Sequence, residues 1–270
     1  VINMKKLAMI AAGALCFGCL EAFTMPTFGL DAQAKYSSEY VVRGSRRGKH
    51  VFLPKAEVNM PVFEKGKAYA GAWAALGVDG NIADTRNEVS PYIGMTYDIT
   101  DMFTLDAGYI HHLYTNETKA APFCKRNTSE LYLGVKADVI TSPSLYFYYD
   151  CDAREVAIEG KIAYSFDFAQ FGVNGLALDL GAKLGYDSAS KPFACKDKIK
   201  KSVDGHKDYV YYGVSADLVY SFNEHAKARA GVACEGNSAK KKEWANRSSF
   251  SGTKNHKNFV WFNASVDCSF

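Results

Sequence analysis

The fold is decided at the C-terminus, by the stretch Val260-Trp261-Phe262-Asn263-Ala264-Ser265-Val266-Asp267-Cys268-Ser269-Phe270. From Val260 to Phe270 every second side chain is apolar, and most of the side chains between them are polar. Successive side chains of an extended strand point to opposite faces. The pattern therefore predicts a strand with one apolar face and one polar face.

The last residue of this stretch, Phe270, is aromatic. A final strand of this kind resembles the targeting strand of bacterial outer-membrane proteins, which ends in Phe and is recognised by the barrel-assembly machinery. The resemblance implies export to the outer membrane and a contact between Phe270 and that machinery during assembly.

The same alternation recurs upstream, where for example Leu131, Leu133 and Val135 oppose Tyr132 and Lys136. We expect strands near residues 35–43, 50–62, 68–78, 87–98, 102–114, 128–139, 144–151, 154–167, 176–187, 207–221, 226–235 and 258–270. This makes about twelve strands, an even number, and most are long enough to cross a bilayer when tilted.

The lengths of the connections give an independent indication of the topology. Counted from the N-terminus, the even-numbered connections are mostly short, and the longest ones, around residues 115–127, 188–206 and 236–257, are odd-numbered. Outer-membrane barrels have short periplasmic turns and longer external loops. We therefore predict an all-β fold, a transmembrane antiparallel up-and-down β-barrel with both termini in the periplasm.

Composition does not distinguish this barrel from a soluble β domain, since the chain is 14% aromatic with a net charge of +3. The number of strands distinguishes the two, because the interior of a barrel of about twelve strands is too wide for apolar side chains to fill. Its apolar faces should then contact lipid, and a soluble two-sheet domain is the alternative. The candidate aromatic residues for the membrane–water interface are Tyr40, Trp73, Tyr97, Tyr109, Tyr164, Tyr186 and Tyr220.

The N-terminal segment is typical of an export signal. A pair of lysines precedes an apolar run that is too short to span a bilayer as a helix. We expect residues 1–34 to form a signal peptide that is cleaved after Ala34, and residues 35–270 to form the outer-membrane barrel. Cleavage near Ala22 is the alternative.

The polar faces of the strands should line the inside of the barrel. In the expected register the inward charged side chains are Glu39, Arg43, Lys55, Glu57, Asp106, Lys136, Asp138, Glu159, Lys161, Asp179, Lys183, Asp217, Lys227 and Arg229. Acids and bases are equally frequent among them, which favours a weakly ion-selective pore for passive diffusion of small polar solutes. The alternative is an interior closed by ion pairs, in a barrel with a structural or adhesive role.

A motif after the signal adds a family resemblance. Ser38-Glu39-Tyr40-Val41-Val42-Arg43-Gly44 is similar to the S-[DE]-Y-V-x-R-G opening of a family of uncharacterised bacterial outer-membrane β-barrel proteins that carry the porin name. Pro54 and the segments Tyr69-Ala70-Gly71-Ala72-Trp73 and Leu105-Asp106-Ala107-Gly108-Tyr109 also match that family. The resemblance is best over residues 36–114. It implies a barrel with a transport role, and it implies no catalytic residue.

Two cysteines form a candidate disulfide. Cys124 and Cys195 each follow a Pro-Phe pair closely and fall in predicted outer loops. Export favours oxidation, so we predict that they pair. The cysteine spacing matches no zinc pattern, and we expect neither a metal nor a cofactor.

A catalytic function is disfavoured. His111 and His112 lie together near the outer end of a predicted strand, but no nucleophile motif accompanies them. Asp106 shares a face with His112 but lies about 20 Å away along the strand. We therefore expect a protein that is not an enzyme, with a surface lipid hydrolase as a less favoured alternative.

The predicted outer loops are basic. Their positive charge favours contacts with lipid headgroups and with the phosphates of lipopolysaccharide. Nucleic acid is not an expected partner at this location, and no sequence feature specifies the solute or an oligomer interface. The basic residues are Arg46, Arg47, Lys49, Lys119, Lys125, Arg126, Lys191, Lys196, Lys198, Lys200, Lys201, Lys240, Lys241, Lys242, Arg247 and Lys254.

Overall fold

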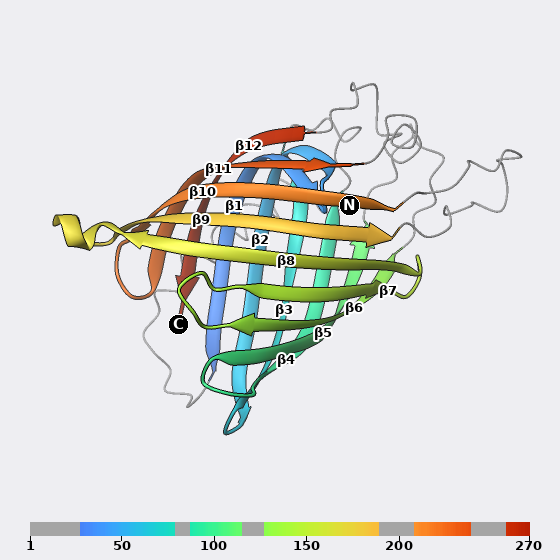
Figure 1. The fold of residues 1–270 in the computed structure, drawn as a ribbon, viewed down its shortest axis with the longest axis horizontal. Coiled ribbons are helices and arrows are strands. Elements are labelled where there is room, and N and C mark those ends of the chain that lie inside the picture. Colours follow the sequence, from blue (N-terminus) through green and yellow to red (C-terminus); the bar gives the residue numbers. More distant parts are fainter. Residues whose placement is uncertain (1–27, 79–86, 115–126, 189–207, 239–257) are drawn as a thin grey trace, which may run out of the picture.

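The computed structural model describes residues 28–78, 87–114, 127–188, 208–238 and 258–270. They form a closed barrel of twelve antiparallel strands in which each strand pairs with its sequence neighbours and β1 pairs with β12 (Figure 1). The strands are β1 (Gly29–Val42), β2 (Ser45–Phe63), β3 (Gly66–Gly77), β4 (Glu88–Asp98), β5 (Phe103–Tyr114), β6 (Thr128–Ala137), β7 (Ser144–Asp150), β8 (Glu155–Asp167), β9 (Leu176–Ser188), β10 (Tyr209–Ser221), β11 (Ala226–Asn237) and β12 (Asn258–Ser269).

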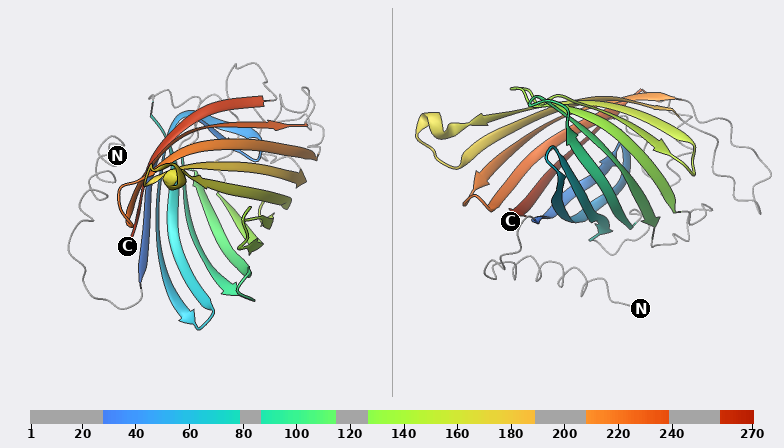
Figure 2. Two further views of the ribbon diagram at one scale, coloured as in Figure 1. Left: turned by 60° about the vertical axis from the view of Figure 1, so that its left-hand side comes forward. Right: turned by 90° about the horizontal axis from the view of Figure 1, so that it is seen from below.

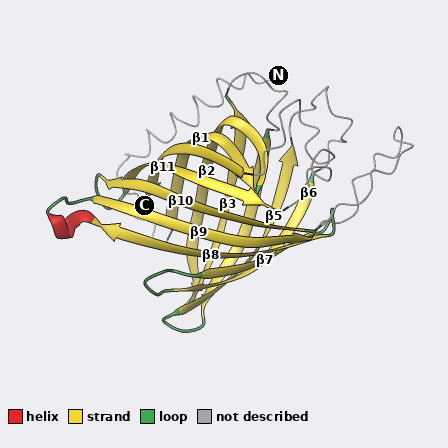
Figure 3. Cartoon of the chain, turned by 45° about the horizontal axis from the view of Figure 1, so that its top comes forward, coloured by secondary structure: helices red, strands yellow, loops and turns green. Residues whose placement is uncertain are grey.

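The structure confirms the predicted fold class. The strands run obliquely around the barrel, as Figure 2 shows from two further directions. Within the described residues the one helix is the short 3-10 helix η1 (Phe168–Phe171) between β8 and β9, seen in red in Figure 3. No helix in this part of the chain is long and apolar enough to cross a bilayer.

The two ends of the barrel differ as the connection lengths predict. The connections that follow β2, β4, β6, β8 and β10 lie at one end, which we call the turn end. Both termini of the barrel lie there too, because Leu30 and Phe270 exchange two backbone hydrogen bonds of 2.9 Å. The odd-numbered connections lie at the other end, which we call the loop end.

The apolar face of each strand lies outside. Ile93, Leu133, Val214 and Val260 point away from the barrel and are 59%, 54%, 61% and 69% exposed. A soluble monomer rarely exposes a continuous apolar band, whereas a barrel in lipid requires one. The protein is therefore an outer-membrane barrel, and a soluble two-sheet domain is excluded by the closed sheet.

The barrel begins earlier in the chain than predicted. Residues 29–34, which the sequence assigns to the signal peptide, belong to β1 and pair with β2, and most of them also pair with β12. The side-chain amide of Gln33 donates a 2.7 Å hydrogen bond to Asp267 in β12. Cleavage after Ala34 would remove this part of β1, whereas cleavage near Ala22 would leave the strand whole. The cleavage site itself stays a prediction.

One hairpin leaves the barrel wall. The pairing of β1 with β12 ends at Ser37, and the pairing of β2 with β3 begins at Val51. Between these points β1 and β2 pair only with each other in the sheet register, with a bulge at Tyr40. We call residues 38–50 the inner hairpin, because its tip at Arg43 and Gly44 lies inside the lumen.

Candidate functional site in the barrel lumen

The strand register places most of the predicted charged residues on the inner wall. Asp106 and Glu159, for example, belong to one cross-strand row on a single face of the sheet. Glu39 and Arg43 are exceptions, because they belong to the inner hairpin and not to the wall. Asp138 is another, because it lies beyond the end of β6, exposed in the β6–β7 connection.

Tyrosines cover the wall formed by β3 to β7. We call the side chains of Tyr69, Tyr92, Tyr132, Tyr146 and Tyr148 the tyrosine wall. Their rings lie against one another, with centroids 5.8 Å apart for Tyr146 and Tyr148 and 6.2 Å apart for Tyr69 and Tyr92. Sequence patterns did not single out this set, although all five occupy polar-face positions of their strands.

Asp106 organises the tyrosine wall. Its carboxylate accepts hydrogen bonds of 2.5 Å from the Tyr69 hydroxyl and 2.6 Å from the Tyr146 hydroxyl, and Lys136 Nζ lies 2.9 Å away. Gly134 on β6 leaves room for the Tyr146 ring, because a Cβ at that position would collide with it. A glycine beneath an aromatic ring lets the ring lie flat on the sheet.

A second carboxylate binds the neighbouring tyrosine. Glu57 accepts a 2.6 Å hydrogen bond from the Tyr92 hydroxyl, and Lys55 Nζ lies 3.0 Å from the same carboxylate oxygen. Ion pairs of this kind join residues on the same strand or on strands close together. They leave the lysine ammonium groups free to contact water.

The opposite wall carries ion pairs, and its tyrosines Tyr209 and Tyr211 lie at the loop end against the hairpin tip. Arg229 on β11 bridges two acids, donating hydrogen bonds of 2.6 Å to Asp179 and 2.7 Å to Asp267. Lys161 pairs with Glu159 on its own strand at 2.7 Å. Each of these bases is matched by an acid, so this wall carries its charge as local pairs.

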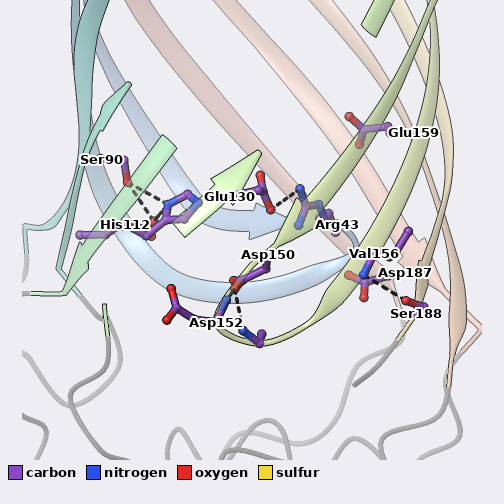
Figure 4. Close-up of polar contacts among 12 residues, drawn as sticks. Arg43, Ser90, His112, Glu130, Asp150, Asp152, Val156, Glu159, Asp187 and Ser188 are labelled. Atoms are coloured by element: carbon purple, nitrogen blue, oxygen red, sulfur yellow. Dashed lines mark hydrogen bonds and ion pairs between the residues drawn. The ribbon is translucent and has the colours of Figure 1, made fainter. Parts of the chain in front are cut away.

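The tip of the inner hairpin crosses the lumen. The Arg43 guanidinium lies 2.8 Å from Glu130 on β6 and 4.5 Å from the ring centroid of Tyr148 on β7. The backbone N–H of Gly44 donates a 3.1 Å hydrogen bond to Glu235 on β11. In Figure 1, β1 and β2 lie behind β7 to β9, and Figure 4 shows Arg43 facing Glu130 inside the barrel.

Two further hydrogen bonds hold the backbone of the tip. The side-chain amide of Asn237 donates a 2.6 Å hydrogen bond to the carbonyl of Gly44. The Tyr209 hydroxyl donates a 3.0 Å hydrogen bond to the carbonyl of Arg43. The hairpin therefore contacts β6, β7, β10 and β11, none of which neighbours β1 or β2 in the sheet.

Two predicted interface aromatics, one in the hairpin and one on β3, pack against each other inside the barrel. Tyr40 is 9% exposed and its ring contacts that of Trp73 edge-on, with Val51 and Ala75 fully buried beside them. The prediction that Tyr40 and Trp73 lie at the membrane surface is therefore wrong, because Tyr40 belongs to the hairpin that folds inward and Trp73 lies on the inner face of β3, opposite Lys55. The other five, Tyr97, Tyr109, Tyr164, Tyr186 and Tyr220, are exposed on the outside as predicted.

Burial of the lumen side chains differs between the two ends. Near the hairpin, the side chains of the bases Arg43 and Lys183 are 16% and 23% exposed. Farther from it, the side chains of Lys55, Lys136 and Lys161 are 42%, 48% and 46% exposed. The loop end of the lumen is therefore filled, and the lysines farther along remain accessible to solvent.

His112 has partners that spacing along its own strand does not indicate. Its Nδ1 lies 2.7 Å from Glu88 and 3.0 Å from the Ser90 hydroxyl, both on β4 (Figure 4). A nucleophile relay needs the acid and the nucleophile on opposite ring nitrogens. Here both contact the same nitrogen, and Glu88 and Ser90 are 1% and 0% exposed. In this arrangement the acid and the hydroxyl are buried and form no relay through the imidazole.

Other predicted sites are placed only in part. Arg46, Arg47 and Lys49 belong to β2 within the inner hairpin, where Arg46 pairs with Glu39 at 3.3 Å, so the prediction of an external basic loop here is wrong. Cys124 and Cys195 lie outside the described residues, as do the basic residues predicted for the other loops. The described part of the chain holds no cluster of potential metal ligands.

Comparison with solved structures finds other β-barrels. The KdgM porin has 13% identity and a TM-score of 0.46, over 90% of this chain and 99% of that one. The NanC porin has 12% identity and a TM-score of 0.49, over 88% and 98%. The translocator domain of the autotransporter NalP from Neisseria meningitidis has 11% identity and a TM-score of 0.48, over 99% and 98%. These likenesses concern the barrel architecture.

No protein-family profile and no curated protein sequence matches the chain. Membership in the porin family that the motif at residues 38–44 resembles therefore stays a prediction. What the structure adds is the position of that motif, which forms the bend and the tip of the inner hairpin.

Proposed function

We propose that the protein is an outer-membrane channel that lets small polar solutes diffuse passively, with weak ion selectivity. The observation that carries this proposal is the polar inner wall, where lysines such as Lys136 and Lys161 are nearly half exposed beside their paired acids. Hydrated charged groups along the inner wall are what a water-filled path for polar solutes requires.

The test is electrical and osmotic. Refolded, monodisperse protein is inserted into planar bilayers, and liposomes that contain it are swollen in small sugars and amino acids. We expect discrete current steps and swelling rates that fall with solute size. Absence of both, from protein that migrates as a folded barrel, would contradict the channel.

The second candidate is a barrel that does not conduct and serves a structural or adhesive role. The inner hairpin favours it, because the contacts of Arg43 with Glu130 and Tyr148 span the loop end. A lipid hydrolase has less support, since Glu88, Ser90 and His112 lack the geometry of a relay.

We propose two further partners from the same features. Phe270 is exposed at the turn end, where the assembly machinery of the membrane would recognise the last strand. The basic residues predicted for the outer loops would contact lipopolysaccharide phosphates. Replacing Phe270 with Ala should lower the yield of folded barrel in cells while leaving refolding in detergent intact.

A further inference from the structure

We propose that the inner hairpin, residues 38–50, is a gate: docked on the far wall it closes the loop end of the lumen, and its release opens that end. This inference rests on the proposed channel function and concerns the regulation of the same lumen. Figure 4 shows the tip residue Arg43 in its docked position, among Glu130, Glu159 and Asp187.

The hairpin can move without breaking the barrel. Its sheet pairing with the neighbouring strands ends at Ser37 and resumes at Val51, so the wall closes below it. A bulge at Tyr40 and a φ of +49° at His50 mark the two bends. Bulges and left-handed residues redirect a strand locally, which makes these positions the natural hinges.

The tip of the docked hairpin is held by individual hydrogen bonds and an ion pair, and its base by the packing of Tyr40 against Trp73, Val51 and Ala75. Arg43 pairs with Glu130, the N–H of Gly44 binds Glu235, and the carbonyl of Gly44 accepts from Asn237. None of these belongs to a sheet ladder. The hydrogen bonds of a sheet ladder break cooperatively. The three contacts at the tip, which we call the latch, can each be replaced by a hydrogen bond to water.

Docking also leaves buried polar atoms without a protein partner. Oδ1 of Asp187 and Oε2 of Glu39 are buried in this region and accept no hydrogen bond from the described residues. Buried acceptors of this kind weaken the state that contains them. Release of the hairpin would hydrate both atoms, which offsets part of the cost of losing the docking contacts.

The test compares latch variants with a matched control. Arg43→Gln and Glu130→Gln each remove one side of the ion pair, and the double variant removes both. Arg154→Gln removes the same charge at the same end of the barrel, from an exposed position in the β7–β8 turn. Each protein is first checked for the heat-modifiable mobility of a folded barrel.

Single-channel recording measures the open fraction. We expect each latch variant to raise it about tenfold, since a charged hydrogen bond in a poorly hydrated site is lost. The double variant should add little to either single variant, because both act on one contact. Arg154→Gln should leave the open fraction at the wild-type value.

A distance measurement follows the hairpin independently of current. Spin labels are placed on the native Cys151, exposed at the β7–β8 turn on the far wall, and on Ser45→Cys beside the tip, with the other cysteines replaced. In the wild type the short distance of the docked state should dominate. The latch variants should add a longer population.

The outcomes separate the gate from the channel. Conduction that the latch variants leave unchanged, with unchanged distances, overturns the gate and keeps the channel. Absence of current from every protein overturns the channel function. In that case a longer distance in the latch variants still supports a releasable hairpin, and an unchanged distance overturns it.

Discussion

Ion pairs occur both at the loop end of the lumen and in the remainder of the lumen, but they connect different parts of the barrel. Away from the inner hairpin, Lys55 and Glu57 pair along one strand, and their lysine remains hydrated. At the loop end, Arg43 pairs with Glu130 across the barrel and the pair is mostly buried. The local pairs are set by strand register alone, whereas the pair across the barrel exists only because a hairpin leaves the wall.

The difference teaches that ion pairs alone do not close a lumen of this width. Pairs between adjacent positions keep their charges on the wall and leave the centre to water, since they need no segment to carry a charge inward. Closure requires backbone inside the barrel, as Arg43 and Gly44 provide. Changing one region to resemble the other tests this difference.

The largest effect is expected from removing the hairpin. Replacing residues 39–49 with Asn-Gly, a sequence suited to a two-residue hairpin turn, should end β1 and β2 at the wall. The loop end then loses its filling and should resemble the rest of the lumen. We expect the rate of liposome swelling in a small sugar to rise about tenfold or more, as for a polar lumen without a plug.

The control for this deletion lies at the turn end of the barrel, away from the inner hairpin. The β8–β9 connection, Phe168 to Asn174, can be replaced by Asn-Gly in the same way. Swelling should not change. Equal rates for the two deletions would show that the hairpin does not limit passage.

The second prediction concerns the stability of the tyrosine wall. Gly134→Ala places a methyl group against the Tyr146 ring, which the bond to Asp106 holds in place. Overpacking of this kind costs about 1–3 kcal/mol. Urea unfolding in detergent micelles, followed by tryptophan fluorescence, should show the lower midpoint.

Gly160→Ala is the matched control for that substitution. A Cβ on Gly160 comes no closer than 3.9 Å to any neighbour, so the change should leave the free energy of unfolding within about 0.5 kcal/mol of the wild type. If the two alanines have equal effects, the ring of Tyr146 does not depend on the glycine beneath it.

The wall of the barrel could be predicted from the sequence, because lipid imposes a rule on every strand. An apolar side chain is needed at each outward position, so Leu131 and Leu133 reveal both the strand and its orientation. The same rule placed Lys136 inside. The start of β1 was missed, since Ala32 and Ala34 suit a cleavage motif as well as an outward strand face.

The inner hairpin could not be predicted in this way. Residues 38–50 lie inside the barrel, away from lipid. Their sequence therefore has no alternation of apolar and polar residues from which the course of the hairpin could be predicted. The position of the hairpin tip is determined by its contacts with Glu130 and Glu235. These two residues are far from the hairpin in sequence and come close to it only when the barrel closes. The partner of His112 was missed for a related reason: Glu88 lies on the adjacent strand, and spacing along one strand does not reveal it.

The smallest effect is expected from a change of one lumen charge. Arg229 bridges Asp179 and Asp267, and Arg229→Gln leaves those two acids without their shared base. The lumen becomes more negative at this point, which favours cations. The permeability ratio of potassium to chloride, taken from the reversal potential in a salt gradient, should rise about two- to threefold.

Lys227→Gln removes the same charge from a neighbouring position on the same strand, and it decides whether location matters. Lys227 is exposed, so solvent and salt screen its charge more than that of the partly buried Arg229. We expect a smaller rise in the permeability ratio than for Arg229→Gln. Equal rises would mean that ions respond only to the total charge of the lumen, and the local pairing of Arg229 with its acids would then have no part in selectivity.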